Sequence, residues 1–494
     1  MDQLALFPTP FFLGLILIGI LLLYAWNGRQ EGWGIPTGMV LATVGAWYYG
    51  DGLYNDYAEY QEKMGNEALE AAWWQVLWFL VVFGVIVQPV NQFFNQRFLR
   101  YRSRTMLYYE TNMLQTRDMQ RQLDKVAWLL FYAWLLLMGV ALLRVKFDFI
   151  GLFAPYLGEK QNPWFRGRMG GGVDAVLSLA GYLQILLTAS FGIFGAVCRN
   201  SSTRTMALTV CVLALPYYFL DRTRNTMIAV ALPGLLAWVF LRLRSGPWTK
   251  AAILAGAFLA INFWFSFVLA NRNEGSISSQ IGKKGALKRV EETRHEGLSM
   301  FSELGYINSF FEKGTLKPNW GGRYFAELVN PIPRALWPSK PTVGLDYAVA
   351  RGFASENASG ASGGVHASIA TGMIGQGIVN FGAFLGPMAA AFLMSLWVSI
   401  LARQDLLGRD PARMLLFSVG MILTFNMGRD ITLLVLYPFV FGWGGLQAAM
   451  YFGVYRPVPP VPPRRKGTNL RPRNTSSEPN GERSAPPLSE SPRP

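Results

Sequence analysis

The chain has 494 residues, of which 51% are hydrophobic and 15% are charged, and its mean hydropathy is +0.23. A soluble domain carries about 25% charged residues, so this composition excludes an ordinary soluble protein. The formal net charge is +15. Basic loops on the cytoplasmic side of a membrane, close to anionic lipid headgroups, explain such an excess without nucleic acid as a partner.

Eleven apolar segments follow one another along the chain, most of them near the roughly 20 residues that cross the membrane hydrocarbon. They cover residues 9–26, 34–50, 71–90, 126–144, 174–197, 206–220, 226–241, 251–270, 373–402, 413–427 and 431–451. The sequence therefore predicts an all-α polytopic membrane protein with about 11 transmembrane helices. The opening MDQLALFPTP lacks the basic stretch of a cleaved signal peptide, so we expect the first span to be retained.

The charges of the loops predict the topology. With eleven spans, five basic segments fall on one side, which the positive-inside rule makes cytoplasmic. They cover residues 91–125, 198–204, 241–250, 401–413 and the tail from Tyr455. The acidic segment 51–70 falls on the other side. The N-terminus is therefore predicted outside and the C-terminus in the cytoplasm.

The same pattern divides the chain into four regions. Residues 1–270 hold the first eight spans, 271–366 form a large external loop, 367–454 hold the last three spans, and 455–494 form a basic, Pro-rich tail. A structureless loop of that length is uncommon, so the external loop is expected to contain elements of its own. Residues 297–314 have apolar positions at helical spacing and predict an amphipathic helix on the membrane or on the bundle. The tail predicts cytoplasmic disorder.

Cationic side chains occur in the external loops, where the positive-inside rule disfavours them. Because guanidinium groups offer paired, permanently charged donors to phosphate, this set predicts a diphosphate site. The preferred residues are Arg222, Arg224 and Arg429, followed by Arg272, Arg334, Lys340 and Arg351. Arg323 lies in the same long loop without being preferred. The alternative is that each arginine pairs with a neighbouring aspartate or reaches a lipid headgroup.

The segment NPIPRALWPSKP (330–341), which we call the elbow, contains four prolines. Proline fixes φ and has no amide donor, so the elbow is neither a helix interior nor a central strand. It can hold Arg334 and Lys340 in place, while Trp337 suits a contact with substrate or the membrane interface. The alternative is a rigid turn that only anchors the loop.

The chain has two histidines, both in the external loop. Histidine is the usual side chain for moving a proton near neutral pH. His366 follows a Gly-rich stretch directly before a span and is a candidate proton acceptor, whereas His295 lies in a charged run typical of a solvated helix face. The sequence contains neither GxxxxGK[ST] nor HExxH, so we expect no nucleotide-driven engine, no metal and no cofactor.

The elbow and the span that follows resemble a known family. IPRALWPSKP, followed by GMIGQGIVNFGAFLG after a large external loop, is similar to the bacterial oligosaccharide repeat-unit polymerases, the Wzy-type O-antigen and exopolysaccharide polymerases. The similarity covers mainly residues 221–390, and the rest matches only in hydropathy. Gln376 is a departure, because members often have Glu there, and it puts an acid role at that position in question.

The resemblance implies a GT-C-like glycosyltransferase bundle in the bacterial inner membrane. It implies transfer of a growing glycan from undecaprenyl diphosphate to the non-reducing-end hydroxyl of an incoming lipid-linked unit at the outer face. The cationic residues would stabilise the diphosphate leaving group, and a base would accept the hydroxyl proton. The candidates for that base are His366, then Asp346 and Glu356. The implied partners are the undecaprenyl-diphosphate-linked oligosaccharide, membrane lipids and a chain-length regulator protein.

Two alternatives stay open at this point. An O-antigen ligase would use the same donor with a lipid A–core acceptor, although the proline–tryptophan element favours a polymerase. A non-enzymatic flippase or transporter of lipid-linked glycans would place charges within its spans and show repeated halves. In this sequence the charges lie in external loops instead.

Overall fold

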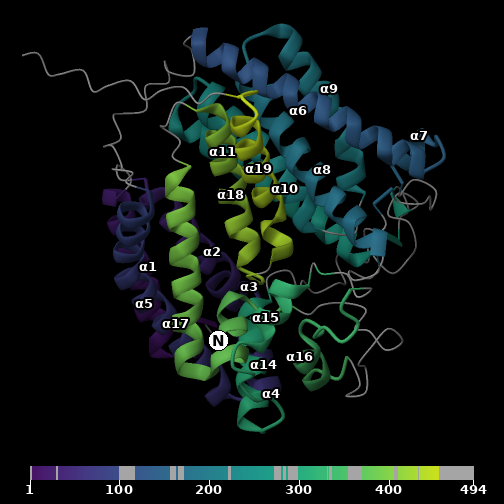
Figure 1. Cartoon of the computed structure of the whole chain (residues 1–494). Helices are drawn as coiled ribbons and strands as arrows, with labels where there is room; N and C mark the ends of the chain where they lie inside the picture. The colour runs from purple at the N-terminus through teal and green to yellow at the C-terminus, as the bar shows by residue number, and fades with distance from the viewer. Residues whose placement is uncertain are drawn as a thin grey trace, which may run out of the picture. The chain divides into compact units, whose positions relative to one another are not determined.

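The structure of the chain, a computed structural model, is helical, and no strand occurs among the residues that it describes (Figure 1). All of these residues belong to the unit Met1–Pro457. They are residues 3–28, 32–99, 117–155, 163–164, 172–220, 224–271, 280–281, 285–286, 299–330, 332, 336–353, 370–404, 410–431 and 433–455.

Each of the eleven predicted spans coincides with helix. The helices are α1 (Thr9–Asn27), α2 (Gly34–Val44) with a π-helical turn (Gly45–Tyr49) and α3 (Gly50–Tyr54), α5 (Asn66–Leu99), α6 (Arg117–Arg144), α8 (Gly172–Val197), α9 (Ser201–Phe219), α10 (Arg224–Ala237) with a π-helical turn (Trp238–Arg242), α11 (Pro247–Ala270), α17 (Met373–Arg403), α18 (Pro411–Met427) and α19 (Leu433–Tyr451).

Six of these helices are long and apolar enough, within the described residues, to cross a membrane: α1, α5, α6, α8, α11 and α17. The segments Thr226–Arg242 and Ala412–Met427 are shorter apolar helices. The prediction of an all-helical membrane protein is therefore confirmed. The number of eleven crossings and the GT-C-like arrangement stay predictions.

Short polar side chains begin several helices. Asp56 accepts a hydrogen bond from the Ala58 amide at the start of α4 (Tyr57–Met64), and Asn200 and Asp410 accept corresponding bonds at the starts of α9 and α18. Such caps satisfy amides that have no partner within the helix. They fix the residue at which each helix begins after a polar connection.

α17 contains a reversal that the continuous apolar run 373–402 did not predict. Gly382 has φ 80° and ψ 178° within it, a left-handed conformation that glycine adopts without a steric penalty. A Cβ on Gly386 would lie 2.5 Å from the backbone nitrogen of Ile378. Residues that far apart in a straight helix are separated by roughly 12 Å. Residues 373–381 and 383–403 therefore form a helical hairpin rather than one straight span.

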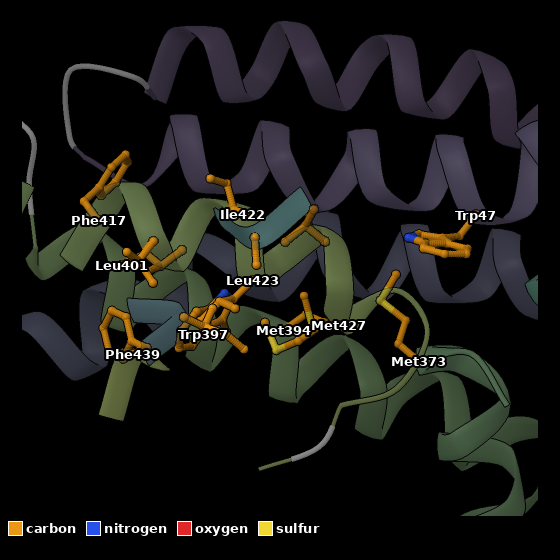
Figure 2. Close-up of a cluster of buried hydrophobic side chains, with 14 of the residues drawn as sticks. Trp47, Met373, Met394, Trp397, Leu401, Phe417, Ile422, Leu423, Met427 and Phe439 are labelled. Atoms are coloured by element: carbon orange, nitrogen blue, oxygen red, sulfur yellow. The ribbon is translucent and has the colours of Figure 1, made fainter. Parts of the chain in front are cut away.

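The main apolar core joins α2, α17, α18 and α19. Figure 2 shows Met394, Trp397, Leu423 and Phe439 gathered in it, with Trp47 from the neighbouring π-helical turn at one end. The buried indole groups are hydrogen-bonded: Trp397 Nε1 donates to Thr424 Oγ1 at 2.8 Å, and Trp47 Nε1 donates to the Phe425 carbonyl at 2.8 Å. Satisfied donors allow these large rings to be buried without a desolvation penalty.

Residues 299–353 of the predicted external loop form what we call the loop layer, which contains α14 (Met300–Glu312), α15 (Gly322–Val329) and α16 (Leu345–Ala350). These helices gather near α4 in Figure 1. The predicted amphipathic helix 297–314 corresponds to α14, whose apolar face is buried against α5 and α17. This helix therefore lies on the bundle.

Polar contacts hold α14 in place. Asp51 accepts a hydrogen bond from the Ser302 amide at 2.9 Å, and its other oxygen accepts from the Tyr60 hydroxyl at 3.0 Å. The Asn308 amide group donates to Gln75 Oε1 at 3.1 Å and to the Ala68 carbonyl at 3.1 Å. Because these groups are buried, their directional bonds fix α14 against α3 and α5.

Candidate functional site

A groove of about 1010 Å³ lies within the loop layer. Its walls come from the connection between α14 and α15, from one face of α15, from the elbow and from α16. Three cationic residues and one acidic residue line it: Lys317, Arg323, Lys340 and Asp346. The elbow thus forms a wall of this groove, through its residues Pro338 to Pro341.

Arg323 is one of two buried cations in the lining of this groove, with Lys340. Its side chain lies in the first turn of α15 and the residue is 2% exposed, yet its Nη2 is 3.6 Å from Asp430 Oδ1. Gly344 (φ 69°) lies against the other side of the guanidinium, where a Cβ would be 3.6 Å from its carbon, an ordinary contact distance. The guanidinium is therefore fixed between the groove wall and the α18–α19 turn.

Asp430 lies in the turn between α18 and α19 and is 7% exposed. Its Oδ1 accepts hydrogen bonds from the Thr371 amide at 3.2 Å and the Thr371 hydroxyl at 3.0 Å. Burial raises the pKa of this carboxyl, while the Arg323 charge and the Thr371 bonds oppose that effect. Arg323, Thr371 and Asp430 are distant in the sequence, and all three meet at this carboxylate.

Glu327 follows Arg323 by one helical turn on α15, so the two side chains share a face. It is 5% exposed, and its Oε2 has no hydrogen-bond partner among the described residues. Burial and the nearby Asp430 charge raise the pKa of Glu327 to about 7, against the lowering effect of Arg323. A carboxyl with such a pKa can both accept and release a proton near neutrality.

Two asparagines position the start of α15. Asn319 Oδ1 accepts from the Arg323 amide at 3.4 Å, and Asn380 Oδ1 accepts from the Tyr324 amide at 3.2 Å. The backbone N–H of Asn319 in turn donates to the Val379 carbonyl at 3.0 Å. Since Val379 and Asn380 belong to the first half of the α17 hairpin, that hairpin determines where Arg323 and Glu327 lie.

Lys340, a predicted diphosphate ligand, is 3% exposed and binds the protein backbone. Its Nζ donates to the Asn330 carbonyl at 2.6 Å and the Ile332 carbonyl at 2.7 Å. These carbonyls follow the last turn of α15, where a cation is favoured. Lys340 therefore fastens the elbow to the end of α15 while it also lines the groove.

Arg351, another predicted ligand, lies outside the groove lining. Its Nη2 is 3.1 Å from Glu303 Oε1, and its guanidinium lies 3.9 Å from the centre of the Tyr306 ring. The Tyr347 hydroxyl also donates to Glu303. These contacts hold α16 on α14.

The other described candidates take different positions. Asp346 lines the groove and accepts from the Asn319 side chain at 2.9 Å. Arg429 is half-buried beside Asp430 and lowers the pKa of that carboxyl. Trp337 Nε1 donates to Ser339 Oγ at 3.1 Å, within the elbow.

Several predicted residues lie outside the described residues: Arg222, Arg272, Arg334, Glu356 and His366, together with His295. Arg224 begins α10, but its side chain is also outside them. Among the residues that are described, no group of three His, Cys, Asp or Glu side chains could hold a metal ion.

Sequence reasoning missed Glu327 and did not prefer Arg323. The signal was present in GRYFAELV, where Arg323 and Glu327 are four residues apart while Phe325 and Leu328 point to the exposed side. That spacing puts one cation and one carboxyl on a common helix face. Their burial depends on Asp430, which is distant in the chain.

Comparisons with models of protein families, with curated proteins and with solved structures found no match to this chain. The chemistry of the site therefore rests on its own geometry. It offers cations for an anionic group, a carboxyl that titrates near neutrality, and a rigid frame that holds both.

Proposed function

We propose that the chain is an integral-membrane glycosyltransferase that polymerises lipid-linked oligosaccharide repeat units. The hydroxyl oxygen at the non-reducing end of an incoming unit attacks the anomeric carbon of the growing chain. A glycosidic bond forms, the bond from that carbon to the diphosphate oxygen breaks, and undecaprenyl diphosphate leaves. The hydroxyl proton passes to a carboxylate of the protein. Neither ATP nor a nucleotide sugar takes part.

The observation that carries this proposal is the buried Arg323, which lines a groove together with other charged side chains and lies beside two buried carboxyl groups. A departing diphosphate gains negative charge, and fixed cations in a partly water-excluded site stabilise that charge. Arg323 and Lys340 are already held by protein partners, so little reorganisation is required during the reaction. Lys317 adds an exposed cation at the same groove.

Glu327 is the first candidate for the proton acceptor in this proposal. Its pKa of about 7 matches the requirement for a general base near neutral pH. Asp346, which lines the groove directly, is the second. The sequence pattern of the elbow favours a polymerase over the other users of lipid diphosphate donors.

The test uses purified protein in liposomes with undecaprenyl-diphosphate-linked repeat units from the source organism, without ATP or nucleotide sugar. We expect glycan chains to lengthen, measured on gels and by mass spectrometry. Arg323→Ala should lower the rate by about 100-fold or more, the effect of removing one preorganised donor. Glu327→Gln should lower it strongly, while the exposed Lys313, outside the groove lining, can be replaced by Ala without effect.

Other outcomes would replace the proposal. If units crossed the vesicle membrane without any extension, the protein would be a transporter. If a single glycan were transferred to added lipid A–core and repeat units were never joined, it would be a ligase. Normal chain growth in Arg323→Ala and Glu327→Gln together would remove the groove from the mechanism.

A further inference from the structure

A second groove lies far along the chain from the loop layer, between α6 and α9, and its volume is about 570 Å³. The two helices are neighbours in Figure 1 and contact each other directly. α6 contributes aromatic rings and α9 contributes hydroxyl groups and apolar side chains. The lining includes Trp128, Phe131, Trp134, Ser202, Thr205 and Thr209.

The surface beside this groove is apolar and exposed. Tyr132 and Leu136 on α6 are 63% and 74% exposed, and Val212 on α9 is 69% exposed. α6 is long and apolar enough to cross a membrane, so we expect its outward apolar surface to face lipid. The groove is therefore next to the hydrocarbon.

One end of the groove is charged and structurally fixed. Gln120 Oε1 accepts from the Arg199 amide at 2.8 Å, and Asn200 donates to Asp124 Oδ2 at 3.3 Å. These bonds tie α6 to the turn that precedes α9. Two exposed cations, Arg121 and Lys125, lie on α6 in the turns directly before Trp128.

The hydroxyl groups of α9 lie at the same end. Ser202 and Thr205 are one turn apart on the groove face and precede the apolar part of the helix. The hydroxyl groups of α9 and the aromatic rings of α6 line the groove together, and the two cations precede Trp128 along α6. A cationic end beside an aromatic and apolar groove matches the phosphate and the acyl chain of a phospholipid.

We propose that this groove binds an anionic phospholipid. The phosphate and its acidic headgroup lie at Arg121 and Lys125, and an acyl chain lies against Trp128 and Phe131. Basic sites between transmembrane helices on the cytoplasmic side bind anionic headgroups through such charges, and 570 Å³ is within the range of ligand sites. This inference is independent of the proposed glycosyl transfer.

The experiment is native mass spectrometry of the purified full chain in detergent, with phosphatidylglycerol, phosphatidylcholine or glycerol 3-phosphate added. We expect phosphatidylglycerol to be retained at least tenfold more than phosphatidylcholine. The double variant Arg121→Glu/Lys125→Glu should lose at least tenfold of this retention. Thr209→Trp, which fills the groove, should lose it as well.

Lys250→Glu is the matched control, because Lys250 lies on α11, at a segment predicted to be on the same side of the membrane, and not on either of the two groove helices. It should retain phosphatidylglycerol like the wild type. Thermal unfolding midpoints without lipid show whether each variant is folded. Equal retention of both lipids, or unchanged retention in the double charge variant, would overturn the proposal. Retention of glycerol 3-phosphate alone would show a site for small anions and would overturn it too.

Discussion

Arg323 Nη2 on α15 lies 3.6 Å from Asp430 Oδ1 in the turn between α18 and α19. The pair joins the loop layer to the bundle, and both residues are buried. A buried ion pair contributes little net stability relative to apolar residues, but removing one partner leaves an uncompensated charge. The pair is therefore sensitive to any change at either position.

We predict that Arg323→Ala destabilises the protein by about 3–5 kcal/mol, because Asp430 would lose its cationic partner while buried. A thiol-reactive dye can measure this, since the only two cysteines, Cys198 and Cys211, are both buried in the folded chain. Their exposure on heating reports unfolding. Arg323→Ala/Asp430→Asn should recover part of the loss, because it removes both charges.

Lys313→Ala is the control for this comparison, because Lys313 is exposed on the same layer and its replacement should change stability by no more than about 0.5 kcal/mol. If Arg323→Ala melted at the wild-type temperature, Arg323 and Asp430 would not be coupled in the folded protein.

A second prediction concerns pH. The pKa of Glu327 rises from 4.5 to about 7 on folding. Between these values the folded protein holds a proton that the unfolded chain releases, so the free energy of unfolding falls as pH rises from about 4.5 to 7. The full loss, about 3 kcal/mol, is reached above pH 7. Glu327→Gln cannot ionise, so its stability relative to the wild type should increase by most of this amount between pH 5 and pH 8.

Glu327→Gln should also lose activity if Glu327 is the proton acceptor. The stability of this variant then reports the cost of burying the carboxylate, and its activity reports the role of that carboxylate in the reaction. Exposed Glu312→Gln serves as the control and should show no such pH-dependent difference. A constant difference in melting temperature between Glu327→Gln and the wild type across this range would show that Glu327 titrates normally in the fold.

Much of the fold could be predicted because it depends on local patterns. Long apolar runs predicted α1, α5 and α6, and the spacing of Phe301, Leu304 and Ile307 predicted α14 within a few residues. Both patterns involve only residues that are close together in the sequence, in adjacent turns of one helix. The described residues of the elbow, 330, 332 and 336–341, lie in neither helix nor strand, as its prolines predict.

The site was harder to predict, because its key contacts join distant parts of the chain. Arg323 meets Asp430, and Thr371 donates to Asp430, a combination that no single segment contains. The reversal at Gly382 could not be predicted from hydropathy, because the same residues have the same hydropathy in a straight helix and in a helical hairpin. The position of Glu327 follows from that reversal.

Gln376 provides a third prediction. Its Nε2 donates to the Ile431 carbonyl at 3.2 Å and its Oε1 accepts from the Ile431 amide at 2.8 Å. A glutamate would keep the second bond and, when ionised, lose the first. We therefore expect Gln376→Glu to cost about 1–3 kcal/mol, the penalty for an unsatisfied buried group. The dye assay measures it, with exposed Gln92→Glu on α5 as a control. Equal melting of the two variants would contradict this role.

A fourth prediction tests the attachment of the elbow. Lys340→Met keeps the apolar stem but removes one ammonium group and its two charge-assisted hydrogen bonds, each worth about 1.5–3 kcal/mol. Hydrogen exchange should become faster at residues 330 and 332 and in the last turn of α15. Lys317→Met, at an exposed position on the same groove, should leave exchange there unchanged. Unchanged exchange in Lys340→Met would mean that the prolines alone hold the elbow.

The last prediction tests the α17 hairpin. A Cβ on Gly377 would collide with the Gly386 carbonyl, so Gly377→Ala must separate the two halves of α17. We expect a loss of about 1–3 kcal/mol from overpacking. Because Asn380 holds the start of α15, the displacement should also reach Arg323 and reduce activity. Gly139→Ala on α6 is the control: its added Cβ meets nothing within 4 Å, and Ala favours a helix interior. If both variants kept wild-type stability and activity, the two halves of α17 would not be packed against each other at this glycine.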